Sequence, residues 1–104
     1  MRERILVIDD EPNIVWLFKE IFGDAYEVLG AQTAEDGLRA AWDHDVHLVM
    51  LDLRLPGISG LQALQELKAQ GHQGPVIIMT AYGEVKTAVQ AMKSGAYDYI
   101  TKPF

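Results

Sequence analysis

The fold is decided near the N-terminus by the stretch Ile5-Leu6-Val7-Ile8-Asp9-Asp10-Glu11-Pro12. Four consecutive apolar residues end at two aspartates, and a proline follows where a helix can begin. A short apolar run that is continuous rather than alternating is typical of a strand covered on both faces of a parallel sheet. The stretch therefore predicts a buried strand that leads directly into a helix, with carboxylates in the turn between them.

The same alternation of strand and helix continues along the chain. Further strands are predicted around residues 26–31, 48–51, 76–79 and 97–100, and helices over 12–22, 34–43, 60–70 and 84–94. Thr33 and Ser59 stand where N-caps are expected, and Gly95 where a C-cap is expected. This order predicts an open α/β sheet with right-handed crossovers. A chain of 104 residues is too short for two domains or for a closed eight-fold barrel, so we expect a single domain over residues 1–104.

Composition excludes several classes of function. The chain has 9 basic and 15 acidic residues, a net charge of −6, which argues against holding nucleic acid or an anionic membrane by charge alone. It contains no cysteine, which excludes disulfide scaffolds, zinc–thiolate sites and cysteine nucleophiles and fits a cytoplasmic protein. The longest apolar run, Ile14–Phe18, is far shorter than the roughly twenty residues of a membrane-spanning helix.

Polar residues stand at the ends of the predicted strands. Asp9 and Asp10 follow the first strand, Asp52 ends the third, Thr80 ends the fourth, and Lys102 closely follows the fifth. Parallel strands have their carboxyl ends at one edge of the sheet, where ligands of such folds bind. We therefore expect these side chains to lie together in space.

Such a group has a definite chemistry. Carboxylates about 5 Å apart repel by roughly 3 kcal/mol per pair at an effective dielectric constant near 20, and either a retained proton or a divalent cation relieves this. Hard oxygen ligands without histidine or cysteine favour Mg²⁺. The ammonium group of Lys102 and the hydroxyl group of Thr80 can both donate hydrogen bonds to a bound anion. A carboxylate nucleophile beside Mg²⁺ and a lysine is an arrangement for phosphoryl transfer.

Simpler interpretations exist for each residue taken alone. The two N-terminal aspartates could only favour the start of the first helix, and Asp52 could only form a turn. Arg54 is either an exposed loop charge or a residue that tunes access to the site. His44 and His47, with aspartates on either side of His44, are a weaker candidate for a metal site. The combination of four strand ends favours the shared site over these alternatives.

Four segments carry a resemblance to a known family. They are Asp9-Asp10-Glu11-Pro12, Leu51-Asp52-Leu53-Arg54-Leu55-Pro56-Gly57, Thr80-Ala81-Tyr82-Gly83 and Tyr99-Ile100-Thr101-Lys102-Pro103-Phe104. Together, in this order, they resemble the receiver domain of bacterial two-component response regulators over residues 4–104. The finer resemblance is to receivers of NtrC-like activators of σ54-dependent transcription.

The resemblance implies a flavodoxin-like, doubly wound sheet of five parallel strands in the order 2-1-3-4-5, with helices on both faces. It implies that Asp52 accepts a phosphoryl group, and that Asp9, Asp10, Asp52 and the backbone carbonyl of Arg54 hold Mg²⁺. Lys102 would pair with the phosphoryl group, next to a cis bond to Pro103. Thr80 and Tyr99 would form the switch, Thr80 moving to a phosphoryl oxygen and Tyr99 turning inward.

It also implies partners. The phosphoryl donor would be a sensor histidine kinase, and the output would be a AAA+ σ54-activator module with a DNA-binding module in a longer chain. The domain itself would touch neither nucleic acid nor membrane, and would catalyse only its own phosphorylation and dephosphorylation.

The chain departs from the family at its end, because receivers continue past the Lys-Pro-Phe segment into a fifth helix. We therefore expect an exposed apolar strip along Trp16, Phe18 and nearby strand residues. Either the sequence is a truncated piece of a longer regulator or another copy covers the strip in a homodimer.

Two other functions stay open at this point. A haloacid-dehalogenase-like phosphatase also uses an aspartate nucleophile with Mg²⁺ and lysine, although such enzymes usually carry a second aspartate where this chain has Arg54. A pseudo-receiver would bind partners without phosphorylation. A dinucleotide site is excluded, because no Gly-x-Gly-x-x-Gly motif follows the first strand.

Overall fold

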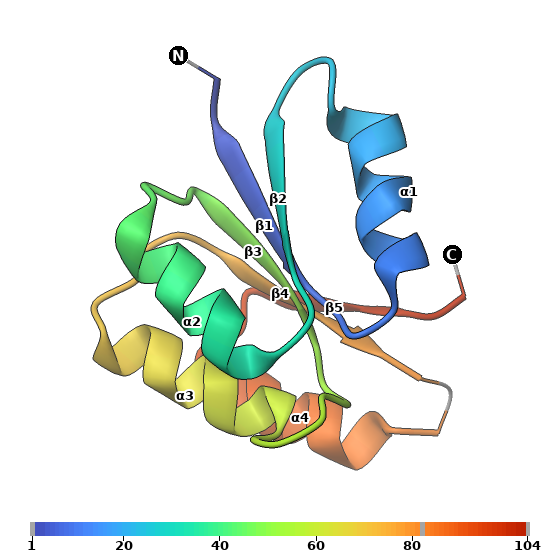
Figure 1. Ribbon diagram of the computed structural model, residues 1–104. Coiled ribbons are helices and arrows are strands. Elements are labelled where there is room, and N and C mark those ends of the chain that lie inside the picture. Colours follow the sequence, from blue (N-terminus) through green and yellow to red (C-terminus); the bar gives the residue numbers. More distant parts are fainter. Residues whose placement is uncertain (1, 82, 104) are drawn as a thin grey trace.

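The computed structural model describes residues 2–81 and 83–103 (Figure 1). Motif residues Tyr82 and Phe104 lie outside this part of the chain. Strands and helices alternate in the order β1 (Arg4–Ile8), α1 (Pro12–Phe22), β2 (Glu27–Ala31), α2 (Ala34–Asp43), β3 (Leu48–Asp52), α3 (Gly60–Ala69), β4 (Val76–Thr80), α4 (Val85–Lys93) and β5 (Asp98–Thr101).

The five strands form one sheet in the order β2-β1-β3-β4-β5, and every neighbouring pair is parallel. The predicted α/β class and strand order are confirmed. The register pairs Ile8 with Ala31 and Leu51, and Thr80 with Thr101. The residues that end the strands therefore lie along one edge of the sheet, which we call the carboxyl edge.

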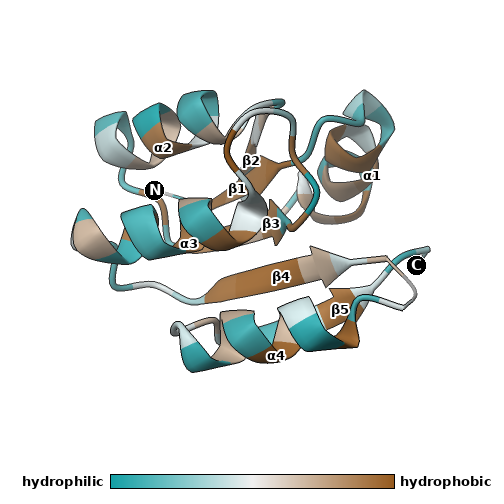
Figure 2. Cartoon of the chain, turned by 90° about the horizontal axis from the view of Figure 1, so that it is seen from below, coloured by the Kyte–Doolittle hydropathy of each residue, from teal (hydrophilic) through white to brown (hydrophobic). Residues whose placement is uncertain are grey.

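Both faces of the sheet are apolar, which explains the continuous apolar runs. Successive strand residues point to opposite faces, so Leu6 and Ile8 pack in one cluster with α2, α3 and α4, whereas Ile5 and Val7 pack in the other with α1. Figure 2 shows the strands coloured mainly as hydrophobic, and helices in which hydrophilic and hydrophobic residues alternate.

Local signals set the helix boundaries as the sequence predicts. The side chain of Thr33 accepts a hydrogen bond from the Asp36 N–H, and that of Ser59 accepts one from the Gln62 N–H, so both are true N-caps. Gly95 follows α4 with φ of 109°, a left-handed conformation that favours glycine.

The predicted apolar strip is only partly correct. Trp16 is 60% exposed, but Phe18 is 7% exposed because it packs against the β1, β2 and β3 residues of the α1 face. Beside α1 that face is hollowed by a groove of about 500 Å³. Its apolar lining comes mainly from α1 and the sheet and comprises Ile5, Phe18, Phe22, Tyr26, Leu48, Met50, Pro75, Ile77 and Ile100.

Candidate functional site at the carboxyl edge

Three of the polar residues at the strand ends are buried. Asp9 is 0% exposed, Asp52 6% and Thr80 3%, and no other polar or charged residue of the described chain is buried to this degree. Burying a charge is costly unless it is paired or hydrogen-bonded. Two buried carboxylates and a buried threonine at one edge of the sheet therefore make this edge the candidate functional site.

Lys102 supplies the positive charge for this site. Its Nζ lies 2.6 Å from Asp9 Oδ2, 3.4 Å from Asp52 Oδ2 and 3.8 Å from Glu11 Oε1. Its backbone N–H donates to the Thr80 carbonyl at 2.7 Å, which continues the β4–β5 pairing to this residue. The predicted convergence of residues 93 positions apart is confirmed, and so is the cis bond between Lys102 and Pro103.

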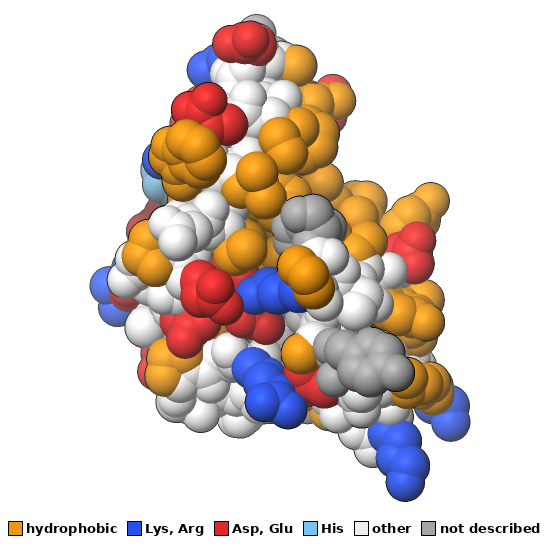
Figure 3. Space-filling view, turned by 90° about the vertical axis from the view of Figure 1, so that its right-hand side faces the viewer, with side chains coloured by type: hydrophobic (Ala, Val, Ile, Leu, Met, Phe, Trp, Pro, Cys, Tyr) orange, Lys and Arg blue, Asp and Glu red, His pale blue; other side chains and the backbone are white. Residues whose placement is uncertain are grey.

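The aspartates lie close enough to share one cation. One carboxylate oxygen from each of Asp9, Asp10 and Asp52 can be chosen so that all lie within 4.8 Å of one another. Asp10 is exposed, which leaves the group open to solvent. Figure 3 shows acidic and basic side chains gathered on the face that carries this edge.

The electrostatics agree with such a site. Burial raises the pKa of Asp52 above its usual range, and the neighbouring charge of Asp9 adds to this, while the Arg54 N–H and Lys102 act in the opposite direction. For Lys102, burial alone would lower the pKa, but the hydrogen bond to Asp9 and the charges of Asp52 and Asp9 raise it overall. The lysine is therefore charged, and the excess of carboxylates favours a bound cation.

Backbone N–H groups orient two of the carboxylates. Asp9 Oδ1 accepts from the Glu11 N–H at 2.9 Å, and Asp52 Oδ1 accepts from the Arg54 N–H at 3.1 Å. In each of these two aspartates, one carboxylate oxygen accepts a hydrogen bond from the backbone N–H two residues later, and the other oxygen contacts Lys102. The side-chain atoms that could coordinate a cation here are all oxygens, a set that fits Mg²⁺ or a similarly hard divalent cation.

Thr80 and Tyr99 lie on neighbouring strands beside a second cavity. Thr80 is buried, whereas Tyr99 is 44% exposed. Both line a cavity of about 370 Å³ together with residues of the β4–α4 loop and α4. Both predicted switch residues thus border the same open space.

Sequence reasoning missed two acidic residues near the site. Glu11 lies 3.8 Å from Lys102, and Glu84 Oε1 lies 3.0 Å from Arg54 Nε. The position of Glu11 directly after the two aspartates could have indicated the first contact. No sequence pattern indicates the second, because it joins two loops that meet only in the folded chain.

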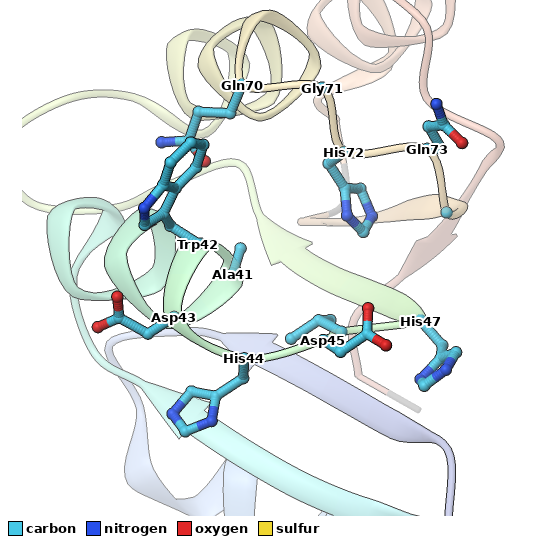
Figure 4. Close-up of a pocket in the computed structure, with 12 residues that line it drawn as sticks. Ala41, Trp42, Asp43, His44, Asp45, His47, Gln70, Gly71, His72 and Gln73 are labelled. Carbon is cyan, nitrogen blue, oxygen red and sulfur yellow. The ribbon is translucent and has the colours of Figure 1, made fainter.

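The weaker metal candidate lies at the opposite edge of the sheet. His44, His47 and His72 line a cavity of about 640 Å³, but the side chains of His44 and His47 point in different directions (Figure 4). Within residues 2–81 and 83–103, the aspartates at the carboxyl edge are the only group of three such ligands close enough for a metal ion. The histidine hypothesis is therefore not supported.

Comparison with known proteins shows which family the chain matches. The response regulator receiver domain family matches residues 5–104. The regulatory protein AtoC of Escherichia coli is 39% identical over 102 residues, which cover 97% of this chain and 22% of AtoC. The transcriptional regulatory protein KdpE of Mycobacterium tuberculosis is 42% identical over 101 residues, which cover 96% of this chain and 44% of KdpE.

Among solved structures, NtrX from Brucella abortus superimposes with a TM-score of 0.92 at 41% identity, covering all of this chain and 24% of the NtrX chain. This chain thus spans less than half the length of the relatives named here. In the described residues, no helix is long and apolar enough to cross a membrane.

Proposed function

The chain belongs to the response regulator receiver domain family, and from this premise we propose that it is a phosphorylation-controlled switch whose phosphoacceptor is Asp52. The observation that carries the proposal is the contact of Lys102 with both Asp9 and Asp52 at the carboxyl edge. The resemblance to receivers of NtrC-like activators is confirmed by AtoC and NtrX. Receivers are signalling modules, so the phosphatase alternative is not supported.

In the proposed reaction, an oxygen of the Asp52 carboxylate attacks the phosphorus of a phosphohistidine. A P–O bond forms, the P–N bond breaks, and the electron pair stays on the imidazole nitrogen. Lys102 lies where it can neutralise a phosphoryl oxygen, because its Nζ is already within 3.4 Å of Asp52. The Arg54 N–H fixes Asp52 Oδ1, which leaves Oδ2 as the oxygen that attacks.

Asp9, Asp10 and Asp52 would hold Mg²⁺, with the backbone carbonyl of Arg54 as a further ligand. When bound, the cation neutralises the charge that accumulates on the phosphoryl oxygens. The close oxygens of the three aspartates support this assignment.

The switch would begin at Thr80, whose hydroxyl donates to a phosphoryl oxygen after moving toward Asp52. Tyr99 would then turn from its exposed position into the space beside Thr80. The cavity of about 370 Å³ that both residues line supports this proposal. A complete switch from 1:99 to 99:1 requires a bias of about 5.5 kcal/mol, to which a phosphoryl dianion beside Lys102 can contribute.

The proposed partners follow from the family. A sensor histidine kinase donates the phosphoryl group, and an output module, of the σ54-activator type, responds to it in the cytoplasm. The much greater lengths of AtoC and NtrX support a place in a longer regulator. A helix after residue 104 would then cover the apolar groove beside α1, whose open lining supports this part of the proposal.

The decisive experiment is to incubate the protein with acetyl phosphate and Mg²⁺ and to measure intact mass. We expect a labile phosphoryl adduct that is absent in Asp52→Asn. The matched control is Asp43→Asn, an aspartate beside the cavity at the opposite edge, which should keep the adduct. An unmodified mass for the parent protein would contradict phosphorylation and favour a pseudo-receiver, and an adduct that survives Asp52→Asn would exclude Asp52 as the acceptor.

A further inference from the structure

The loops on either side of Asp52 are tied together by one carboxylate. Glu84 Oε1 lies 3.0 Å from Arg54 Nε, and the same oxygen accepts the Ala81 N–H at 3.2 Å. Arg54 belongs to the loop between β3 and α3, and Ala81 to the loop between β4 and α4. A single oxygen atom therefore bridges two segments that are distant in sequence.

Both of these partners are neighbours of residues in the site. Arg54 stands two positions after Asp52 and donates its backbone N–H to that carboxylate. Ala81 directly follows Thr80. One oxygen of Glu84 thus contacts the side chain of Arg54, which stands two positions after the phosphoacceptor, and the N–H of Ala81, which stands one position after Thr80. Both groups are donors to which anions bind.

The position of Glu84 links this contact to α4. Glu84 is the N-cap residue of that helix, but its side chain makes no capping hydrogen bond to the helix. It turns toward Ala81 and Arg54 instead, with only 14% of the side chain exposed. A change at this carboxylate therefore acts directly on the start of α4.

We propose that Glu84 is a positioning residue that holds the unphosphorylated arrangement of the two loops, and that a phosphoryl group on Asp52 competes with it for Arg54 and the Ala81 N–H. The inference rests on the proposed function. A phosphoryl group has a larger charge and more acceptor oxygens than one carboxylate, so it can take both donors. Once the phosphoryl group holds both donors, the Glu84 side chain is no longer fixed to the two loops. The N-terminus of α4, whose N-cap is this residue, is then released as well.

The test is the affinity of the protein for beryllofluoride, a phosphoryl mimic, in the presence of Mg²⁺. Glu84→Gln keeps the size of the side chain but removes its charge. We expect it to bind beryllofluoride about three- to tenfold more tightly, because an ion pair and a charged hydrogen bond no longer oppose the mimic. Glu84→Asp keeps the charge and should stay closer to the parent protein.

This pair of variants separates the proposed role from simple packing. If Glu84 only filled space, the isosteric Glu84→Gln would be neutral and the shorter Glu84→Asp would be the perturbed one. A double-mutant cycle gives a second criterion: in an Arg54→Ala background, the gain from Glu84→Gln should shrink. Because Arg54 is 74% exposed, that background is expected to fold.

The matched control is Glu27→Gln, which breaks the Arg4–Glu27 pair of 3.4 Å between β1 and β2 and should leave the affinity unchanged. If the parent protein binds beryllofluoride but Glu84→Gln binds no more tightly than Glu27→Gln, the role of Glu84 is wrong and the proposed function stands. If the parent protein neither binds beryllofluoride nor gains a phosphoryl adduct, both proposals are overturned.

Discussion

The two edges of the sheet carry similar residue types in very different arrangements. At the carboxyl edge, Asp9 and Asp52 are buried and share one lysine. At the opposite edge, the histidines and aspartates line the larger cavity, but their side chains point apart (Figure 4). The comparison shows that cavity size does not identify a site. Buried charges of opposite sign in contact with one another are the better indicator, because burying them is costly and such groups concentrate at functional sites.

The largest expected effect comes from Asp9→Asn. Removing one carboxylate from the group of three should weaken Mg²⁺ binding by about 100-fold, since the remaining ligands carry less charge and fewer anionic oxygens. Titration calorimetry with Mg²⁺ would measure this. His44→Gln at the opposite edge should leave the affinity unchanged, and an equal loss in both variants would contradict the distinction between the edges.

A smaller effect on stability is expected for Lys102→Met. This change leaves Asp9 and Asp52 close together without the cation that pairs with them, and such a loss costs about 3 kcal/mol, the lower end of the range for a buried pair, because Lys102 is partly exposed. Urea unfolding without divalent cations would measure the loss, and added Mg²⁺ should restore part of it. Lys93→Met, on the exposed surface of α4, is the control. A Lys102→Met protein as stable as the parent would show that the lysine contributes nothing to the folded domain.

The smallest effect concerns His72 at the opposite edge. Burial lowers the pKa of this histidine below its ordinary value of 6.5, and the nearby charge of Lys68 adds to this; its Nε2 is buried without a hydrogen-bond partner. The unfolded chain therefore binds the proton more readily. Stability should be intact above about pH 6.5 and should fall as the pH drops through the lowered pKa.

His72→Gln should remove this part of the acid sensitivity in unfolding curves measured between pH 7 and pH 5. His44→Gln should retain it. If the two variants lose stability on acidification to the same extent as the parent protein, His72 is not the group that titrates.

Much of the architecture could be predicted because its signals are local. The continuous apolar runs indicate strands covered on both faces, and Thr33 and Ser59 indicate where helices begin. The convergence of Asp9, Asp52 and Lys102 could be predicted as well, since parallel strands bring their carboxyl ends to one edge. The burial of Phe18 was not predicted, because periodicity does not say which residue of an apolar helix stripe reaches the sheet.

The sequence by itself determined the order of strands and helices and the residues placed at the strand ends, since these depend on periodicity, capping and chain direction. Only the tertiary structure decided that one oxygen of Glu84 joins Arg54 to the Ala81 N–H and that the histidines of the opposite edge diverge. The physical reason is that such contacts depend on side-chain orientation across elements distant in sequence. That orientation is set by packing of the folded chain, which no local pattern encodes.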